Sequence, residues 1–294
     1  MIRKVRREAL DEERYSACLQ ESEQYNSYAE LQFLDKVCTK CEFLVFNDYE
    51  AVMPLNLVRK FGVRVVIMPM LCQQLGVFSR RDDPAVNGMF LQFLQQKFNI
   101  LTYSFNAGNK FNADVNYRPN YILHSAPYAE VYKKYSASRR RNIKKAAAPS
   151  VEFCDELISQ DWQAFVSENL KGSREKEKVK TIRLIERLHS AGMLTMRGAL
   201  IDGRLQSLLF LIVGRNAVYL PVFVNHRDLQ EKNLPSVMID KVLQTFVDTH
   251  DFNFVGSSIP SVAAFNERFG AEKQQYASIV KRPIDLLKSI LGKS

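Results

Sequence analysis

The sequence has few of the residues that build metal centres and disulfide frameworks. Its 294 residues include four histidines and five cysteines. The histidines form no HxxH or HExxH group, which argues against a metallohydrolase. Cys38 and Cys41 have the CxxC spacing, but a second pair that would complete a zinc site is missing. A redox CxxC would open a helix, whereas this one precedes a strand. We therefore expect no metal and no disulfide framework.

Long apolar segments are missing as well. No run of apolar residues reaches the roughly 20 that span a bilayer, and residues 1–14 lack the apolar core of a secretory signal. We expect a cytoplasmic protein, either free or at the inner face of the membrane. Hydrophobic residues make up 46% of the chain and charged residues 25%, as in globular proteins with a full core. The length favours about two domains.

The chain does contain a dense basic block, residues 133–145, which reads KKYSASRRRNIKK. The block holds seven cations and no acid, so the other residues carry only +2 of the net charge of +9. This density is typical of a site that binds phosphate or nucleic acid. The alternative is a solvated helix face. Ser136 or Ser138 can cap a helix here, and the spacing pairs Arg140 with Lys144 and Arg141 with Lys145 on one side of that helix.

Helix and strand periodicities alternate along the first half of the chain. Helices are predicted near residues 8–21 and 27–39, and a three-stranded meander over 41–46, 51–58 and 63–71. A helix near 84–98 and strands near 100–105 and 115–124 complete this half.

The second half repeats the order of the first. We expect a strand near residue 151, helices near 159–169 and 174–191, a meander over 193–201, 204–213 and 217–224, a helix near 235–250, a strand at 251–256, a helix at 261–269 and a strand at 274–280. Asp202-Gly203 between apolar runs indicates a tight hairpin. The predicted fold class is α+β, with two lobes, residues 1–133 and 134–294. Each lobe has a mostly antiparallel central sheet flanked by helices, and the second lobe begins with the basic helix.

The second meander, the helix after it and the segment VGSSIPSVAAFNERFGAEKQQY are similar to the core of the GNAT N-acyltransferase superfamily. That superfamily holds the pyrophosphate of acyl-CoA on a loop Q/R-x-x-G-x-G/A in front of the helix. The matching positions here are Gln230, Asn233 and Pro235. Asparagine can adopt the left-handed conformation of a glycine, but proline has no amide to donate. The tyrosine that often protonates the thiolate is replaced by Asn266, which cannot act as an acid.

The chain resembles more specifically the Fem-type aminoacyltransferases, tandem GNAT folds that build peptidoglycan bridges from aminoacyl-tRNA. The likeness runs roughly from residue 10 to 280, without the long helical hairpin of some Fem members. Three patterns carry it, P-x-x-x-Q-x-x-G, Y-S…R-x-x-I-x-K-A and F-x-x-x-F-G-A. They are matched by Pro69, Gln73 and Gly76, by Tyr135, Ser136, Arg140, Ile143, Lys145 and Ala146, and by Phe265, Phe269, Gly270 and Ala271.

Charge and resemblance together nominate the candidate site residues. Those expected to bind substrate or phosphate are Tyr135, Arg139, Arg140, Lys144, Lys145, Ser257, Ser258 and Tyr276. The degenerate pyrophosphate loops contain Gln73, Gln74 and Gly76 in the first lobe and Gln230 and Asn233 in the second. The two serines are equally typical of a turn at a strand end, and a packed aromatic is the alternative for the tyrosine of the last strand. No catalytic base is assigned.

Three functions remain open at this point. The first is a Fem-like acyl- or aminoacyltransferase that joins an activated acyl donor, such as aminoacyl-tRNA, to an amine such as a bacterial cell-wall precursor. The basic helix would then contact phosphates of a phosphorylated partner. The second is an N-acyltransferase with acyl-CoA as donor. The third is a non-catalytic module that binds RNA or an anionic membrane surface through the basic block.

Overall fold

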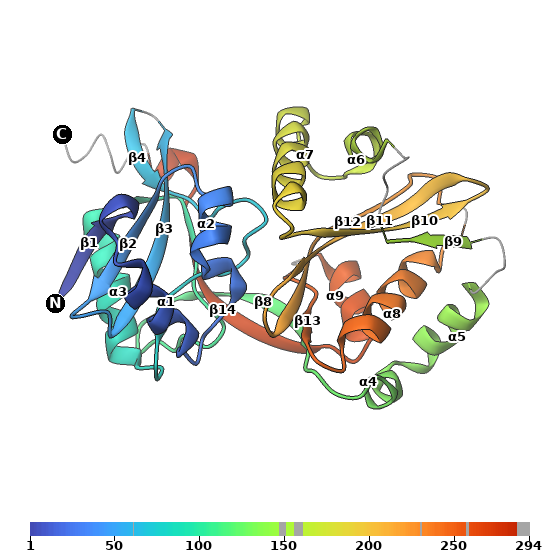
Figure 1. Cartoon of the computed structure of the whole chain (residues 1–294), viewed down its shortest axis with the longest axis horizontal. Helices are drawn as coiled ribbons and strands as arrows, with labels where there is room; N and C mark the ends of the chain where they lie inside the picture. The colour runs from blue at the N-terminus through green and yellow to red at the C-terminus, as the bar shows by residue number, and fades with distance from the viewer. Residues whose placement is uncertain (61, 147–150, 156–160, 230, 257–258, 287–294) are drawn as a thin grey trace. The chain divides into compact units, whose positions relative to one another are not determined.

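The computed structural model describes the whole chain except residues 61, 147–150, 156–160, 230, 257–258 and 287–294. The chain forms two compact units. Unit 1 consists of Met1–Pro119 and Gln274–Ser294, and unit 2 consists of Asn120–Lys273. Both are α+β, with mostly antiparallel sheets and flanking helices (Figure 1), which confirms the predicted fold class. The sequence-based division lies between residues 133 and 134, whereas unit 2 begins at Asn120, because Tyr121, Leu123 and Val131 belong to the core of unit 2.

Unit 1 contains a sheet with the strand order β1-β2-β3-β4-β6. Its neighbours are antiparallel except for the parallel pair β4 and β6. The strands of this sheet are β1 (Ile2–Arg6), β2 (Cys41–Phe46), β3 (Ala51–Lys60), β4 (Val63–Val66), β6 (Asn99–Ile100) and β5 (Phe78–Ser79), which pairs with β3. Unit 1 also contains β7 (Thr102–Ser104), which pairs with residues 278–280. Its helices are η1 (Arg7–Ala9), α1 (Glu12–Gln20), η2 (Ser27–Ala29), α2 (Leu31–Val37) and α3 (Pro84–Lys97).

The sheet of unit 2 has the strand order β8-β13-β12-β11-β10-β9. Only β12 and β13 run parallel among these neighbours in the described residues. The strands are β8 (Asn116–Leu123), β9 (Val151–Cys154), β10 (Thr195–Ile201), β11 (Arg204–Val213), β12 (Ala217–Asn225) and β13 (Asp251–Asn253). The unit boundaries fall inside β8 and the last strand, β14 (Glu272–Val280), so both strands carry the chain from one unit into the other. The Asp202-Gly203 hairpin is confirmed, because both residues have positive φ and Ile201 pairs with Arg204.

The helices of unit 2 cover both faces of its sheet. Figure 1 shows α6 and α7 on one face and α4, α5, α8 and α9 on the other. Their bounds are α4 (Tyr128–Lys134), α5 (Ala137–Ala146), α6 (Trp162–Asn169), α7 (Glu175–Ser190), α8 (Leu234–Phe246) and α9 (Pro260–Glu267). The core between the sheet and α8 is apolar and includes Leu209, Leu211, Val218, Ile239 and Phe252. None of the described helices has the length and apolarity that crossing a bilayer demands.

Three segments differ from the sequence-based prediction. The basic block forms the end of α4 and most of α5, with a break at Tyr135, whose backbone is extended. Ser136 caps the new helix, because its Oγ accepts the amide of Arg139 at 3.1 Å. The strand predicted over residues 63–71 ends at Val66, ahead of Pro69, which has no amide for a sheet. The edge strand β1 was missed because its alternation is weak, with Val5 as its one buried residue.

The structure explains why the Phe-Gly-Ala motif has a glycine at residue 270. Gly270 has φ +79°, and a Cβ at this position would lie 2.6 Å from Cβ of Lys134 and 3.0 Å from its carbonyl oxygen. The amide of Ser136 donates to the carbonyl of Arg268 at 3.0 Å, which holds the two segments together. The motif therefore marks the place where the end of α4 passes directly over the chain after α9.

Replacing Gly270 with alanine should destabilise the protein more than the same change at Gly192. Gly192 has a similar φ of +69° with nothing near its missing Cβ, so it isolates the conformational cost of about 1 kcal/mol. Gly270→Ala adds the collision with Lys134, and we expect a total loss of about 3 kcal/mol. Urea denaturation of the two variants measures the difference, and equal losses would show that the close approach does not constrain residue 270.

Candidate functional site

The candidate site lies in unit 2 where the parallel strands β12 and β13 separate. The strands pair from Ala217 and Asp251 to Tyr219 and Asn253, after which β12 continues while the chain beyond β13 turns away. Val255 in that turn has φ +63°, a strained conformation for a β-branched residue. Its amide donates to Oδ1 of Asn253 at 2.8 Å. The opening is at the carboxyl ends of two parallel strands, where α/β proteins commonly bind ligands.

A pocket of about 620 Å³, called here the α8 pocket, occupies this opening. Its wall comes from α5, β12, the start of α8, the turn after β13, and α9. The cations are Arg139, Lys232 and Arg268; the polar neutral residues are Asn142, Asn225, Asn233, Ser236, Ser261 and Asn266; the large apolar ones are Leu220, Pro221, Phe223, Phe254, Val262 and Phe265. The described lining contains no Asp, Glu, His or Cys. The pocket therefore suits a ligand with an anionic part and an apolar part.

Arg139 is the buried member of the basic block. It is 2% exposed, and its guanidinium lies 4.2 Å from the ring centres of both Phe265 and Phe269. Nη2 donates to the carbonyl of Phe265 at 2.9 Å, and Nη1 donates to Oγ of Ser236. These contacts join α5 to α8 and α9, with a cation–π contribution from each ring.

The charge of Arg139 is not balanced by a carboxylate. Within the described residues the guanidinium bonds only to neutral oxygens, and its Nε has no hydrogen-bond partner. Burial, followed by the charge of the nearby Arg268, lowers the pKa of Arg139 to about 10, and Tyr135 acts in the opposite direction. Ser236 lies in the first turn of α8, so the guanidinium also meets the positive end of that helix dipole. A buried cation without a counter-charge is costly, and a bound anion would relieve that cost.

The backbone amides at the start of α8 are already engaged. The amide of Leu234 donates to the carbonyl of Glu231, the amides of Ser236 and Val237 donate to the carbonyl of Asn233, and Pro235 has none. Asn233 has φ −92° and ψ −6°, so the expected left-handed conformation is absent there. A pyrophosphate cradle of backbone amides is thus missing from the described residues of this loop. The polar groups of this wall that can face a ligand are side chains, among them Ser236, Asn225 and Asn266.

The other predicted residues of the basic block are placed elsewhere. Tyr135 is buried between the rings of Tyr132 and Phe269, and burial followed by the nearby charge of Asp240 raises its pKa. Arg140 donates to the carbonyls of Lys133 and Tyr135, and so caps the end of α4. The two remaining candidates, Lys144 and Lys145, are exposed on the outer side of α5. Gln230, Ser257 and Ser258 lie outside the described residues.

The predicted loop of unit 1 is held by internal hydrogen bonds. The amides of residues 75–77 donate to Ser104, Tyr103 and Asn109, and Gln74 Oε1 accepts the amide of Ala107 at 2.8 Å. A Cβ at Gly76 would collide with Asn109 and come within 2.6 Å of the Asn106 amide. Gln74 and Gly76 therefore stabilise this loop of unit 1 through internal contacts.

Tyr276 also belongs to unit 1 and is 6% exposed. Burial raises its pKa, whereas the charge of Arg118 and hydrogen bonds from Gln73 and Arg118 oppose the rise. Tyr276 therefore lies in a polar cluster with Gln73 and Arg118 of unit 1.

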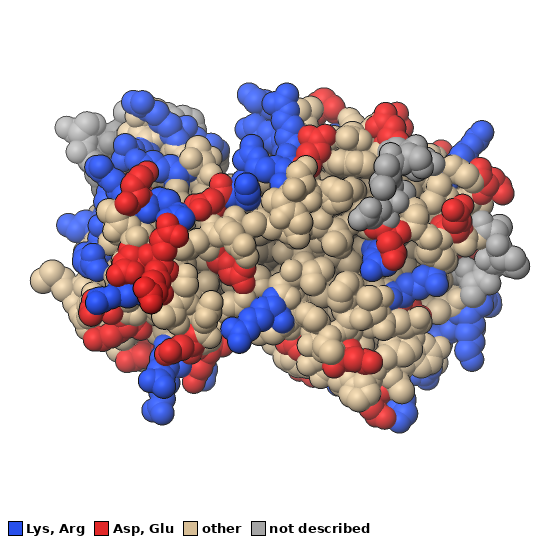
Figure 2. Space-filling view, in the orientation of Figure 1, with Lys and Arg blue, Asp and Glu red and all other residues tan. Residues whose placement is uncertain are grey.

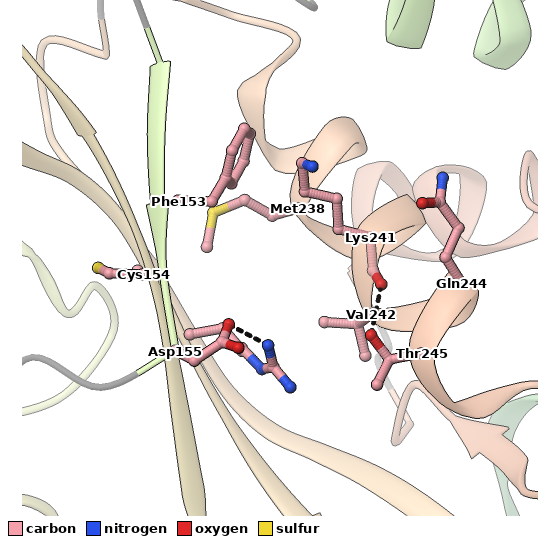
Figure 3. Close-up of a pocket in the computed structure, with 10 residues that line it drawn as sticks. Phe153, Cys154, Asp155, Met238, Lys241, Val242, Gln244 and Thr245 are labelled. Carbon is pink, nitrogen blue, oxygen red and sulfur yellow. Dashed lines mark hydrogen bonds and ion pairs between the residues drawn. The ribbon is translucent and has the colours of Figure 1, made fainter.

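A second, smaller pocket of unit 2 contains one ion pair and one further cation. It measures about 270 Å³ and lies between β9, β10 and α8 (Figure 3). Asp155 and Arg197 form an ion pair there, and Nζ of Lys241 lies 4.4 Å from the centre of the Phe153 ring. This wall therefore contains an acid beside its cations, whereas the described lining of the α8 pocket contains none. Within the described residues no cluster of three His, Cys, Asp or Glu side chains could hold a metal ion.

Comparisons with known proteins agree with this architecture. No family model matches the sequence, and no curated protein matches it either. The structure of FemX is similar, with a TM-score of 0.63, 8% identity, and coverage of 95% of this chain and 97% of that one. A tandem GNAT protein from the clavulanic acid biosynthesis pathway is also similar, with a TM-score of 0.57, 13% identity, and coverage of 95% of this chain and 98% of that one. The structure of L-PGS from Bacillus licheniformis matches with a TM-score of 0.52, 12% identity, and coverage of 96% of this chain and 94% of that one. The chain therefore has the two-lobe GNAT fold.

Asp240 anchors α8, the helix that borders the site. It is 4% exposed, and its carboxylate accepts the Tyr128 hydroxyl at 2.8 Å and the Gln244 amide at 2.9 Å. Burial raises the pKa of Asp240, whereas these bonds, Tyr135 and the charge of Lys241 act in the opposite direction. The buried carboxyl thereby links α4 to the middle of α8.

The raised pKa of Asp240 makes stability depend on pH. The folded protein keeps this proton to a higher pH than the unfolded chain, so the free energy of unfolding should fall as pH rises from about 4 through the folded pKa. Asp240→Asn keeps an oxygen for Tyr128 and removes the titration, so its pH profile should be flatter over that range. Urea denaturation at a series of pH values measures both profiles. Asp228→Asn, at an exposed position, controls for the lost charge, and an unchanged slope in Asp240→Asn would contradict the assignment.

Proposed function

We propose that this protein is an amide-forming acyltransferase of the aminoacyl type. It moves an aminoacyl group from the 3′-terminal ester of an RNA to a primary amine, and the α8 pocket holds the reacting end of the donor. The observation that carries the proposal is a cationic pocket at the separation of β12 and β13 whose described lining has no carboxylate. The likeness of the whole chain to FemX and the motifs of the Fem type support an aminoacyl donor.

In the proposed reaction the amine nitrogen attacks the ester carbonyl. A C–N bond forms, the C–O bond to the ribose breaks, and the proton lost by the amine ends on the ribose oxygen, so the products are an amide and an RNA with a free hydroxyl. The carbonyl oxygen becomes negative on the way. Ser236, Asn225 and Asn266 offer neutral donors in the pocket wall, and Arg139 supplies positive charge there.

The described wall offers no carboxylate or imidazole to act as a base. In the proposed mechanism the proton therefore passes from the amine to the leaving oxygen, directly or through water. Catalysis then comes from holding amine and ester close together and from the field of the wall.

An acyl-CoA donor is the second candidate, and it is favoured by the likeness to the tandem GNAT protein whose structure is described as being without AcCoA. The engaged amides at the start of α8 and the missing amide of Pro235 speak against it. Isothermal titration with acetyl-CoA separates the two donors. We expect no binding at about 1 mM ligand, and saturable binding in the micromolar range would favour acyl-CoA instead.

Arg139→Met should reduce transfer far more than it reduces stability. Methionine keeps much of the bulk against the two phenylalanine rings and removes the charge, so we expect about a 100-fold loss in kcat/KM with an aminoacyl-RNA donor. The free energy of unfolding should change by less than about 2 kcal/mol, because an apolar side chain can replace a buried ion at little cost. Mass spectrometry of the amide product measures transfer, and urea denaturation measures stability.

The matched control is Arg183→Met, at an exposed position of α7, which should transfer at the normal rate. Arg139→Lys should recover part of the activity, because it restores the charge without the planar fork. Equal activity of Arg139→Met and Arg183→Met would contradict the role of the pocket charge. Absence of amide product from the natural chain with aminoacyl-RNA and a panel of amines would contradict the proposed function itself.

A further inference from the structure

The outer side of α5 carries cations that the α8 pocket does not use. Arg141, Lys144 and Lys145 are exposed, and none of the three has an ion-pair partner among the described residues. Figure 2 shows Lys and Arg side chains gathered over this helix and, separately, over α7. Like charges three and four residues apart repel by about 0.2–0.5 kcal/mol per pair. The helix therefore keeps an unbalanced row of charge that an anionic partner would stabilise.

This row borders a hollow of about 410 Å³, called here the α5 hollow. Its wall consists of Tyr132, Ala137, Arg140, Arg141, Lys144 and Lys145. Four of these six residues are cations, and none is an acid. The ring of Tyr132 is fixed from behind, because it packs at 5.8 Å on Tyr128 and 5.0 Å on Tyr135, measured between ring centres. The hollow thus combines one fixed aromatic ring with a dense positive charge.

A fixed ring beside several cations is the combination that binds single-stranded nucleic acid, in which the phosphates meet the cations and a base stacks on the ring. A membrane surface would be contacted by exposed apolar side chains as well. In the described part of unit 2 the large exposed apolar side chains are Val179, Val213, Ile259 and Val262, and none of them lies on α4 or α5. The chemistry of the hollow therefore favours RNA over a lipid surface.

We propose that the α5 hollow docks single-stranded RNA, with phosphates on Lys144 and Lys145 and one base against Tyr132. This deepens the proposed function, on which it rests for the role of that RNA as the aminoacyl donor. Residues of the basic block then bind two parts of the same aminoacyl-RNA from opposite sides of α5. Arg139 faces the pocket, and the outer cations hold the RNA.

Binding of an uncharged RNA tests the docking site without any catalysis. Fluorescence anisotropy with a labelled single strand of about 12 nucleotides gives the dissociation constant over a salt series. Lys144→Ser with Lys145→Ser should weaken binding and reduce the slope of log affinity against log salt by about 1.4, which corresponds to two phosphate contacts. Tyr132→Leu should weaken binding about tenfold and leave the slope unchanged, whereas Tyr132→Phe should bind normally.

The matched control removes the same charge from α7, with Lys180→Ser and Arg183→Ser, both at exposed positions. This variant should bind RNA with the natural affinity and slope. An equal loss from the α7 variant, normal binding by Tyr132→Leu, or binding to phosphatidylglycerol vesicles in place of RNA would each overturn the docking site. RNA binding without transfer would support the docking site and contradict the proposed function. Transfer that does not depend on Lys144 and Lys145 would support the proposed function and contradict the docking site.

Discussion

The buried charge of Arg139 is the constraint around which unit 2 is arranged at its candidate site. The guanidinium packs against two phenylalanine rings and bonds to the first turn of α8 and the last turn of α9, so it helps to set the distance between those helices. It also leaves a positive field in a wall that contains no described carboxylate. One side chain therefore contributes both to the shape of the pocket and to its preference for an anion.

The basic block is two structures rather than one. The chain leaves the helical conformation at Tyr135 and re-enters it after the Ser136 cap, and the turns of α5 then direct its cations to different sides. Arg139 shares a side with the buried Ile143, four residues later, whereas Arg141, Lys144 and Lys145 face outward. The separation follows from helix periodicity, and it converts one run of like charge into a pocket wall and an outer surface.

Much of the fold could be predicted from the sequence, because strand alternation, the Asp202-Gly203 turn and helix periodicity are local signals. The inward position of Arg139 could also be predicted from the sequence, because Arg139 lies four residues before the apolar Ile143. The partners of the Arg139 charge could not be predicted from the sequence. Ser236 and Phe265 lie 97 and 126 residues away in the chain and meet Arg139 only through the packing of three helices. The engaged amides at the start of α8 depend on hydrogen bonds that leave no pattern in the sequence.

The central claim is that the unbalanced charge of Arg139 receives the anionic or electron-rich end of a donor in the α8 pocket. The most direct measurement is the NMR signal of the Arg139 Nε–H group, assigned by comparison with Arg139→Lys, during titration with a stable amide analogue of a 3′-aminoacyl adenosine phosphate. A saturable shift of this signal is expected, and no shift of the corresponding Arg183 signal on α7. An Arg139 signal that stays in place at saturating ligand would contradict it.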